Sequence, residues 1–147
     1  MEYKDALRRA AAMCSRQEQC STHIREKLLE WNTDPSDVDK IIVKLQEEKF
    51  LDDQRYANFY VRDKFRFNKW GKIKITAMLR QKGIYATAIE EALKRIDDKA
   101  YYDTCAELIQ KKSESLDEEN HFTRKGKLFR FAAGRGFESE LIHRILS

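Results

Sequence analysis

The sequence predicts an all-α protein, built as an elongated array of three tandem three-helix repeats. Its composition favours helices, because 37% of the 147 residues are charged and only one proline and five glycines are present. Apolar residues recur at helical spacing along most of the chain. An internal similarity with offsets of 51 and 53 residues adds the third observation, since periods of this size are typical of helical repeat arrays.

The internal repeat is seen in three segments that align without gaps. They read WNTDPSDVDKII (31–42), KGIYATAIEEAL (82–93) and RGFESELIHRIL (135–146). Asn32, Gly83 and Gly136 share one position, and these residue types tolerate the left-handed backbone that closes a helix. Each alignment therefore predicts the end of one helix and the start of the next.

Two further helices precede each of these segments. Apolar stripes predict helices over 3–14 and 21–31 in the first repeat and over 53–69 and 72–82 in the second. In the third repeat, a stripe from Tyr101 to Ile109 and a helix from Phe122 to Ala133 flank an acidic, solvated connection at 113–120. The predicted repeats span 1–50, 51–97 and 98–147.

The sequence does not indicate a membrane protein, a disulfide-bonded protein, a metal site or a cofactor site. No apolar run is long enough for a membrane span and no signal peptide is recognisable, so we expect a cytoplasmic protein. We also expect it to be a monomer. Three cysteines without CxxC spacing indicate free thiols rather than disulfides or zinc. The three histidines lack ligand spacing, and no cofactor-binding motif is present.

The middle repeat is the basic part of the chain. Residues 55–82 hold nine Lys or Arg and one acid, Asp63, whereas residues 1–50 hold nine bases and ten acids. A charge run is usually a solvated helix face, but near absence of acids favours an electropositive binding surface. Phe59, Phe65 and Phe67 are interpreted as packing, and Trp70 is left open. The candidate residues for binding a protein partner or nucleic acid are Arg62, Lys64, Arg66, Lys69, Lys72, Lys74, Arg80 and Lys82, with Arg124, Lys125, Lys127, Arg130 and Arg135 in the third repeat.

The stretch LDDQRYA (51–57) raises the question of catalysis. Asp52 and Asp53 are consecutive, so on a helix their side chains diverge by about 100° and do not converge on one metal or proton. As helix caps they fit well, because one can accept backbone N–H bonds and the other lies near the positive helix end. We predict a helix start, with Arg55 pairing with an acid one turn away, and no catalytic site. A small nuclease built on the two acids is the weaker alternative.

These stretches resemble the RecX family of recombination regulators. The similarity rests on LDDQRYANFYVRD, NKWGKIKITAMLRQKGI and RKGKLFRFAAGRGF, and it spans nearly the whole chain. Asn32 and Ala132 depart from the typical pattern. The matching residues are Leu51, Asp52, Asp53, Arg55, Tyr56, Ala57, Gly71, Ile75, Leu79, Lys82, Gly83, Ile84, Arg135, Gly136 and Phe137. Those that we interpret as structural are Leu51, Asp52, Asp53, Arg55, Tyr56, Ala57, Gly71, Gly83 and Gly136.

The resemblance implies a non-enzymatic modulator of RecA that needs no cofactor. Such proteins bind the RecA nucleoprotein filament and restrain its ATPase, strand-exchange and coprotease activities. An elongated helical array has a shape suited to bridging successive protomers. A helical protein that binds single- or double-stranded DNA directly, through phosphate neutralisation, remains the alternative.

Overall fold

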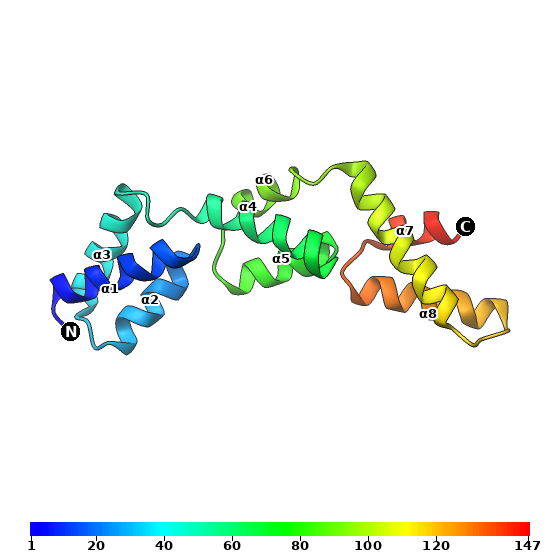
Figure 1. Cartoon of the computed structure of the whole chain (residues 1–147), viewed down its shortest axis with the longest axis horizontal. Coiled ribbons are helices and arrows are strands. Elements are labelled where there is room, and N and C mark those ends of the chain that lie inside the picture. The colour runs from blue at the N-terminus through cyan, green and yellow to red at the C-terminus, as the bar shows by residue number, and fades with distance from the viewer.

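The computed structural model describes residues 1–147 as an elongated row of α-helices, with the two termini at opposite ends (Figure 1). The helices fall into three consecutive groups of three, which confirms the predicted all-α repeat array. The elements are α1 (Tyr3–Arg16), α2 (Ser21–Glu30), α3 (Pro35–Glu47), α4 (Asp53–Asp63), the π-helical turn η1 (Lys64–Asn68), α5 (Lys72–Gln81), α6 (Ala86–Leu93), α7 (Asp98–Ser115), α8 (His121–Gly134) and α9 (Ser139–Leu146).

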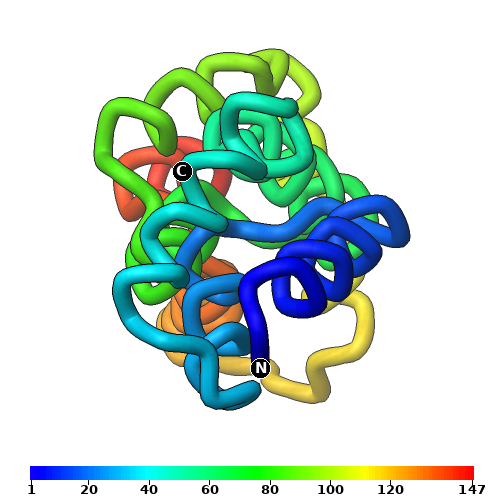
Figure 2. The backbone as a smooth tube through the Cα atoms, turned by 90° about the vertical axis from the view of Figure 1, so that its left-hand side faces the viewer, coloured from blue at the N-terminus to red at the C-terminus, as the bar shows by residue number.

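Helices pack mainly within their own group. In the first repeat α1, α2 and α3 contact one another, and in the second repeat α6 packs on both α4 and α5. In the third repeat α7, α8 and α9 contact one another. Viewed along the long axis, the groups lie one behind another (Figure 2). Short helices of this kind bury too little surface alone, so the repeats depend on their junctions for stability.

The apolar core is divided unevenly between the repeats. The first repeat has its own cluster, which includes Leu28, Leu45 and also Leu51 from the next segment. The second and third repeats share one continuous cluster, in which Tyr101 contacts both Phe65 and Phe137 at ring-centroid distances of 5.8 and 5.2 Å. Cys20 is the residue of the first repeat that reaches into this shared core.

The predicted left-handed positions are confirmed. Asn32, Gly83 and Gly136 have φ angles of 58°, 77° and 97°. After each, the next amide donates back into the preceding helix, and these bonds are Thr33 N to Leu28 O (3.1 Å), Ile84 N to Leu79 O (3.1 Å) and Phe137 N to Ala132 O (3.3 Å). The same helix ending, a Schellman motif, therefore recurs in all three repeats.

The prediction of one long helix over 53–69 is wrong for its C-terminal part. Regular α-helix ends at Asp63, and the chain continues as the π-turn η1, which stops where Lys69 adopts a left-handed φ of 55°. The reversal brings Gly71 against the third repeat, where its N–H donates to the Arg135 carbonyl at 2.8 Å. A straight helix would have carried the chain past this contact.

The acidic connection predicted at 113–120 is shorter than expected. Helix α7 continues through Ser115, so only residues 116–120 join it to α8. Arg124 fixes this turn by donating to the carbonyls of Ser113, Leu116 (3.2 Å) and Glu118 (3.3 Å). Lys127 pairs with the Glu118 carboxylate at 3.1 Å. The connection is bonded to α8 rather than merely solvated.

Candidate interaction surface

The two acids of the LDDQR stretch act as helix caps. The Asp52 carboxylate accepts a bond from the Arg55 N–H at 3.0 Å, at the start of its own helix α4. Asp53 instead reaches across to the first repeat, where it accepts from the Ser21 N–H (3.0 Å) and hydroxyl (3.1 Å). Helix α2 has no cap from its own N-cap residue Cys20, so Asp53 satisfies a donor there. No group of three or more His, Cys, Asp or Glu side chains is arranged to hold a metal ion.

Arg55 ties the same junction together, but its partner is more distant in sequence than predicted. Its Nε lies 2.8 and 2.9 Å from the two carboxylate oxygens of Glu18, in the connection between α1 and α2. Its remaining nitrogens donate to the carbonyls of Lys49 (3.1 Å) and Phe50 (3.3 Å). The bond to Glu18 raises the pKa of Arg55 above its ordinary value. This arginine is therefore structural.

Gly71 and Gly136 lie at the junction of the second and third repeats. A Cβ on Gly71 would lie 2.3 Å from the carbonyl carbon and oxygen of Gly136. Beside this contact, the Lys72 N–H donates to the Tyr101 hydroxyl at 2.8 Å, and that hydroxyl donates to Glu138. Burial is the main reason that the pKa of Tyr101 is raised above its ordinary value. The backbones of Gly71, Lys72 and Gly136 and the side chains of Tyr101 and Glu138 therefore align the two repeats.

Lysines and aromatic rings alternate along one side of the middle repeat. We call this series, Lys82–Tyr60–Lys64–Trp70–Lys74, the lysine–aromatic ladder. Each ammonium lies over a ring, at 5.8 and 5.5 Å for Lys82 and Lys64 over Tyr60 and at 5.2 and 4.6 Å for Lys64 and Lys74 over Trp70. Trp70, whose role the sequence left open, is half-buried and serves as a platform for two cations.

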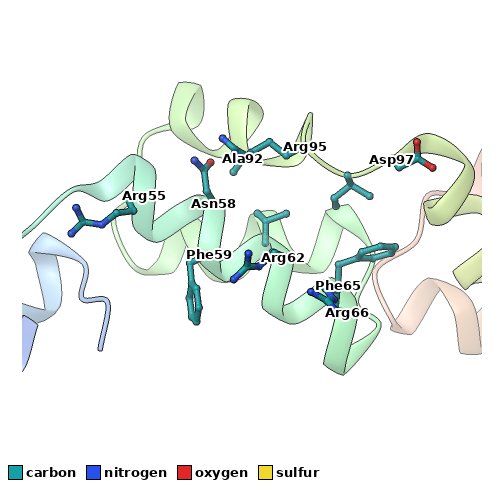
Figure 3. A pocket seen from close by; sticks show the side chains of 11 residues that line it. Arg55, Asn58, Phe59, Arg62, Phe65, Arg66, Ala92, Arg95 and Asp97 are labelled. Carbon is teal, nitrogen blue, oxygen red and sulfur yellow. The ribbon is translucent and has the colours of Figure 1, made fainter. Parts of the chain in front are cut away.

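A second basic feature lies between α4 and α6, and we call it the arginine groove (Figure 3). Arg62 and Arg66 line it from α4 and η1, and Arg95 lines it from the segment after α6. Phe65 and the more exposed Phe59 contribute apolar walls. The sequence did not indicate Arg95, because its neighbours in sequence include acids and only folding brings it to the same groove as Arg62.

None of the eight candidate side chains between residues 62 and 82 forms an ion pair with a carboxylate. The seven ion pairs of the molecule all involve other bases, such as Arg55 with Glu18 and Lys127 with Glu118. Ordinary exposed helices intersperse both signs of charge, and such pairs are then common. The middle repeat thus presents a basic surface whose charge is not neutralised within the chain.

The five candidate bases of the third repeat divide into two kinds. Arg124 and Lys127 hold the turn before α8, and Arg135 donates to the Asn68 carbonyl at 3.1 Å across the repeat junction. Lys125 and Arg130 are exposed beside Phe122, which is 86% exposed, and half-buried Phe129. Only the second kind is positioned to meet a partner.

The packing role predicted for three phenylalanines is correct for one of them. Phe65 packs on the shared core and contacts Tyr101. Phe59 is 46% and Phe67 is 75% exposed, with Arg62 and Arg66 at 5.8 Å from their rings. The π-turn rotates Phe67 away from the core, which the sequence periodicity could not indicate.

Comparison with known proteins agrees with this architecture. Models of the second and third three-helix domains of RecX match residues 52–93 and 99–146. The regulatory protein RecX of Chlorobium phaeobacteroides is 32% identical over 143 residues, which cover 97% of this chain and 92% of that protein. The chain belongs to the RecX family.

Other RecX proteins are similar over differing shares of their length. The regulatory protein RecX of Clostridium botulinum is 36% identical over 81% of this chain, but the match spans only 56% of that relative. A crystal structure of a regulatory protein RecX superimposes with a TM-score of 0.90 at 27% identity, covering 97% of this chain and 72% of that one. RecX from Lactobacillus salivarius, at 23% identity, shares the fold with a TM-score of 0.91 over 98% and 94% of the two chains. None of the nine α-helices has the length and hydropathy that crossing a bilayer requires.

Proposed function

We propose that this RecX protein is a non-enzymatic regulator that binds the RecA nucleoprotein filament and inhibits or modulates its ATPase, strand-exchange and coprotease activities. The observation that carries the proposal is the unpaired basic surface of the middle repeat, held on an elongated array. Acidic protein surface and DNA phosphate are the two partners that such a surface attracts, and a nucleoprotein filament offers both. We place its action in the cytoplasm, as a monomer, with repeats at 1–50, 51–97 and 98–147.

The experiment that tests the proposal is a titration of RecA ATPase activity on single-stranded DNA with this protein. Saturable inhibition is expected. An ATPase rate that stays constant while the protein is in excess would contradict a regulatory role toward RecA.

Direct DNA binding is the second candidate, and the lysine–aromatic ladder favours it. Cations over rings resemble the surfaces that bind single strands through phosphate contacts and base stacking. Such binding would not need RecA and would weaken steeply with salt. Capture of RecA in the absence of DNA supports the filament proposal, whereas tight binding of DNA without RecA supports this alternative.

A further inference from the structure

The arginine groove and the lysine–aromatic ladder of the middle repeat do not share a basic residue. The arginine groove contains no lysine, and the lysine–aromatic ladder contains no arginine. Arg62 in the groove and Lys64 in the ladder are two positions apart, less than one helical turn, so their side chains point about 160° apart around the helix axis. The groove and the ladder therefore face different sides of the repeat.

The groove is free to accept an anion. Arg62, Arg66 and Arg95 are exposed, and their guanidinium groups form no ion pair and no hydrogen bond within the chain. The one carboxylate that lines the groove belongs to Asp97, and it already accepts the Ala100 N–H at 2.9 Å as the cap of α7. The cavity of about 530 Å³ has the size of a pocket that holds a few side chains.

The groove is also apolar between its charges. Phe65 is half-buried against Tyr101, and Val61, Ala92 and Ile96 close the space behind it. These apolar walls suit a Leu, Ile or Phe side chain. Arginines beside aromatic rings are the composition that protein interfaces favour, whereas lysine is depleted there.

We propose that the arginine groove binds an acidic protein segment that carries an apolar anchor side chain. The planar guanidinium fork pairs with a carboxylate through two parallel hydrogen bonds, and the anchor fills the space between Phe65 and Phe59. This deepens the proposed function, on which it rests, because the groove then holds the protein component of the filament.

Fluorescence anisotropy tests the proposal with a labelled peptide in which Phe and Leu are spaced among Asp and Glu. The groove variant combines Arg62→Gln, Arg66→Gln and Arg95→Gln. The control combines Lys64→Gln, Lys74→Gln and Lys82→Gln in the ladder and removes the same charge. Circular dichroism verifies that both remain folded. We expect the groove variant to bind the peptide at least about tenfold more weakly than wild type, and the control to bind within about threefold, since each charged hydrogen bond contributes about 1.5–3 kcal/mol.

Three results would overturn the inference. The first is that the wild-type protein shows no saturable binding of the peptide. The second is that the groove variant and the ladder variant lose peptide affinity equally. The third is that an analogue peptide, with Ser in place of Phe and Leu, binds the wild-type protein as tightly as the original peptide does. A labelled single-stranded oligonucleotide that loses affinity for the groove variant, while the peptide does not, would assign the groove to nucleic acid instead. RecA ATPase measured on the same samples separates the two failures: an uninhibited ATPase overturns the regulatory function, even where the peptide binds.

Discussion

The backbones of Gly71 and Gly136 touch where the second and third repeats meet. Gly71 N–H donates to the Arg135 carbonyl at 2.8 Å, and the Ile73 N–H donates to the Gly136 carbonyl at 3.0 Å. These bonds join the start of α5 to the end of α8. Two glycines separated by 65 positions are therefore one structural unit, and that unit aligns the basic middle repeat with its neighbour.

A methyl group at Gly71 should disrupt this junction. The new Cβ would meet rigid backbone at 2.3 Å, so Gly71→Ala should lower the free energy of unfolding by about 1–3 kcal/mol. Thermal or urea unfolding measures the change. Gly134→Ala is the matched control, because no atom lies within 4 Å of the added group and alanine favours the helix. Equal losses for both variants would contradict the junction.

The left-handed helix ends give a second comparison. Gly83 has a φ of 77° and its added Cβ would lie 2.5 Å from the Thr22 hydroxyl, so Gly83→Val should lower the melting temperature strongly. Asn32→Gly should preserve or raise it, because glycine adopts φ near 58° without strain. Similar melting temperatures for the two variants would argue against the shared helix ending.

Asp52 and Asp53 should affect different helices. Asp52→Ala removes the cap of α4 and Asp53→Ala removes an acceptor from α2, each at a cost of about 0.5–2 kcal/mol. Hydrogen exchange should quicken at Arg55 in the first variant and at Ser21 in the second. Labelled DNA incubated with the wild-type protein in magnesium or manganese should stay intact. Metal-dependent cleavage that Asp52→Ala abolishes would instead support a nuclease.

The buried thiols should make the fold sensitive to alkaline pH. Burial is the largest cause that raises the pKa of Cys14 and of Cys105 from 9.0 to about 11. Below pH 9 both states keep these protons, and the stabilisation is complete. Between pH 9 and 11 only the unfolded chain releases them, so stability falls as pH rises through this range. Urea unfolding across the range measures the slope, which Cys105→Ala should reduce. An unchanged slope would mean that Cys105 does not contribute.

Much of the fold was predictable because it depends on local features. The left-handed positions at Asn32, Gly83 and Gly136, the apolar stripes and the cap at Asp52 all follow from residue type and spacing. The misses concern contacts between helices that are separate in sequence. The bond from Asp53 to Ser21 and the placement of Arg95 in the same groove as Arg62 depend on how these helices meet, and no local period encodes this.

The sequence predicted the basic surface as an excess of charge. It did not predict that this surface includes both an arginine groove and a lysine–aromatic ladder. Sequence counts could not separate arginines that line a groove from lysines that lie over rings. Nor could they indicate that Arg124 and Arg135 are occupied by backbone carbonyls. In these cases the bonding partner is a main-chain oxygen, which exists at every position and therefore leaves no signal in the sequence.

Inhibition of RecA should depend on the middle repeat rather than on the first. The variant that reverses Arg66, Lys69, Lys72 and Lys74 to Glu should repel acidic protein and phosphate, so more of it is needed for the same inhibition. Because Lys72 and Lys74 lie over the rings of Tyr101 and Trp70 at 4.6 Å, the reversals should also cost about 0.5–1 kcal/mol for each lost cation–π contact. Melting temperature and helix content must therefore be measured beside the ATPase titration.

The matched control for this variant reverses Lys4, Arg8, Arg16 and Lys40 in the first repeat. All four are exposed and form no ion pair, unlike Arg25, which pairs with Asp39 at 2.7 Å. The control has the same net charge as the middle-repeat variant, so nonspecific charge effects on the assay should be equal. If both folded variants inhibit RecA as well as wild type does, the basic surface is only solvated, and the contact with the filament must involve other residues. If inhibition is lost in the middle-repeat variant alone, the unpaired bases of η1, its C-cap Lys69 and the start of α5 belong to the attachment surface.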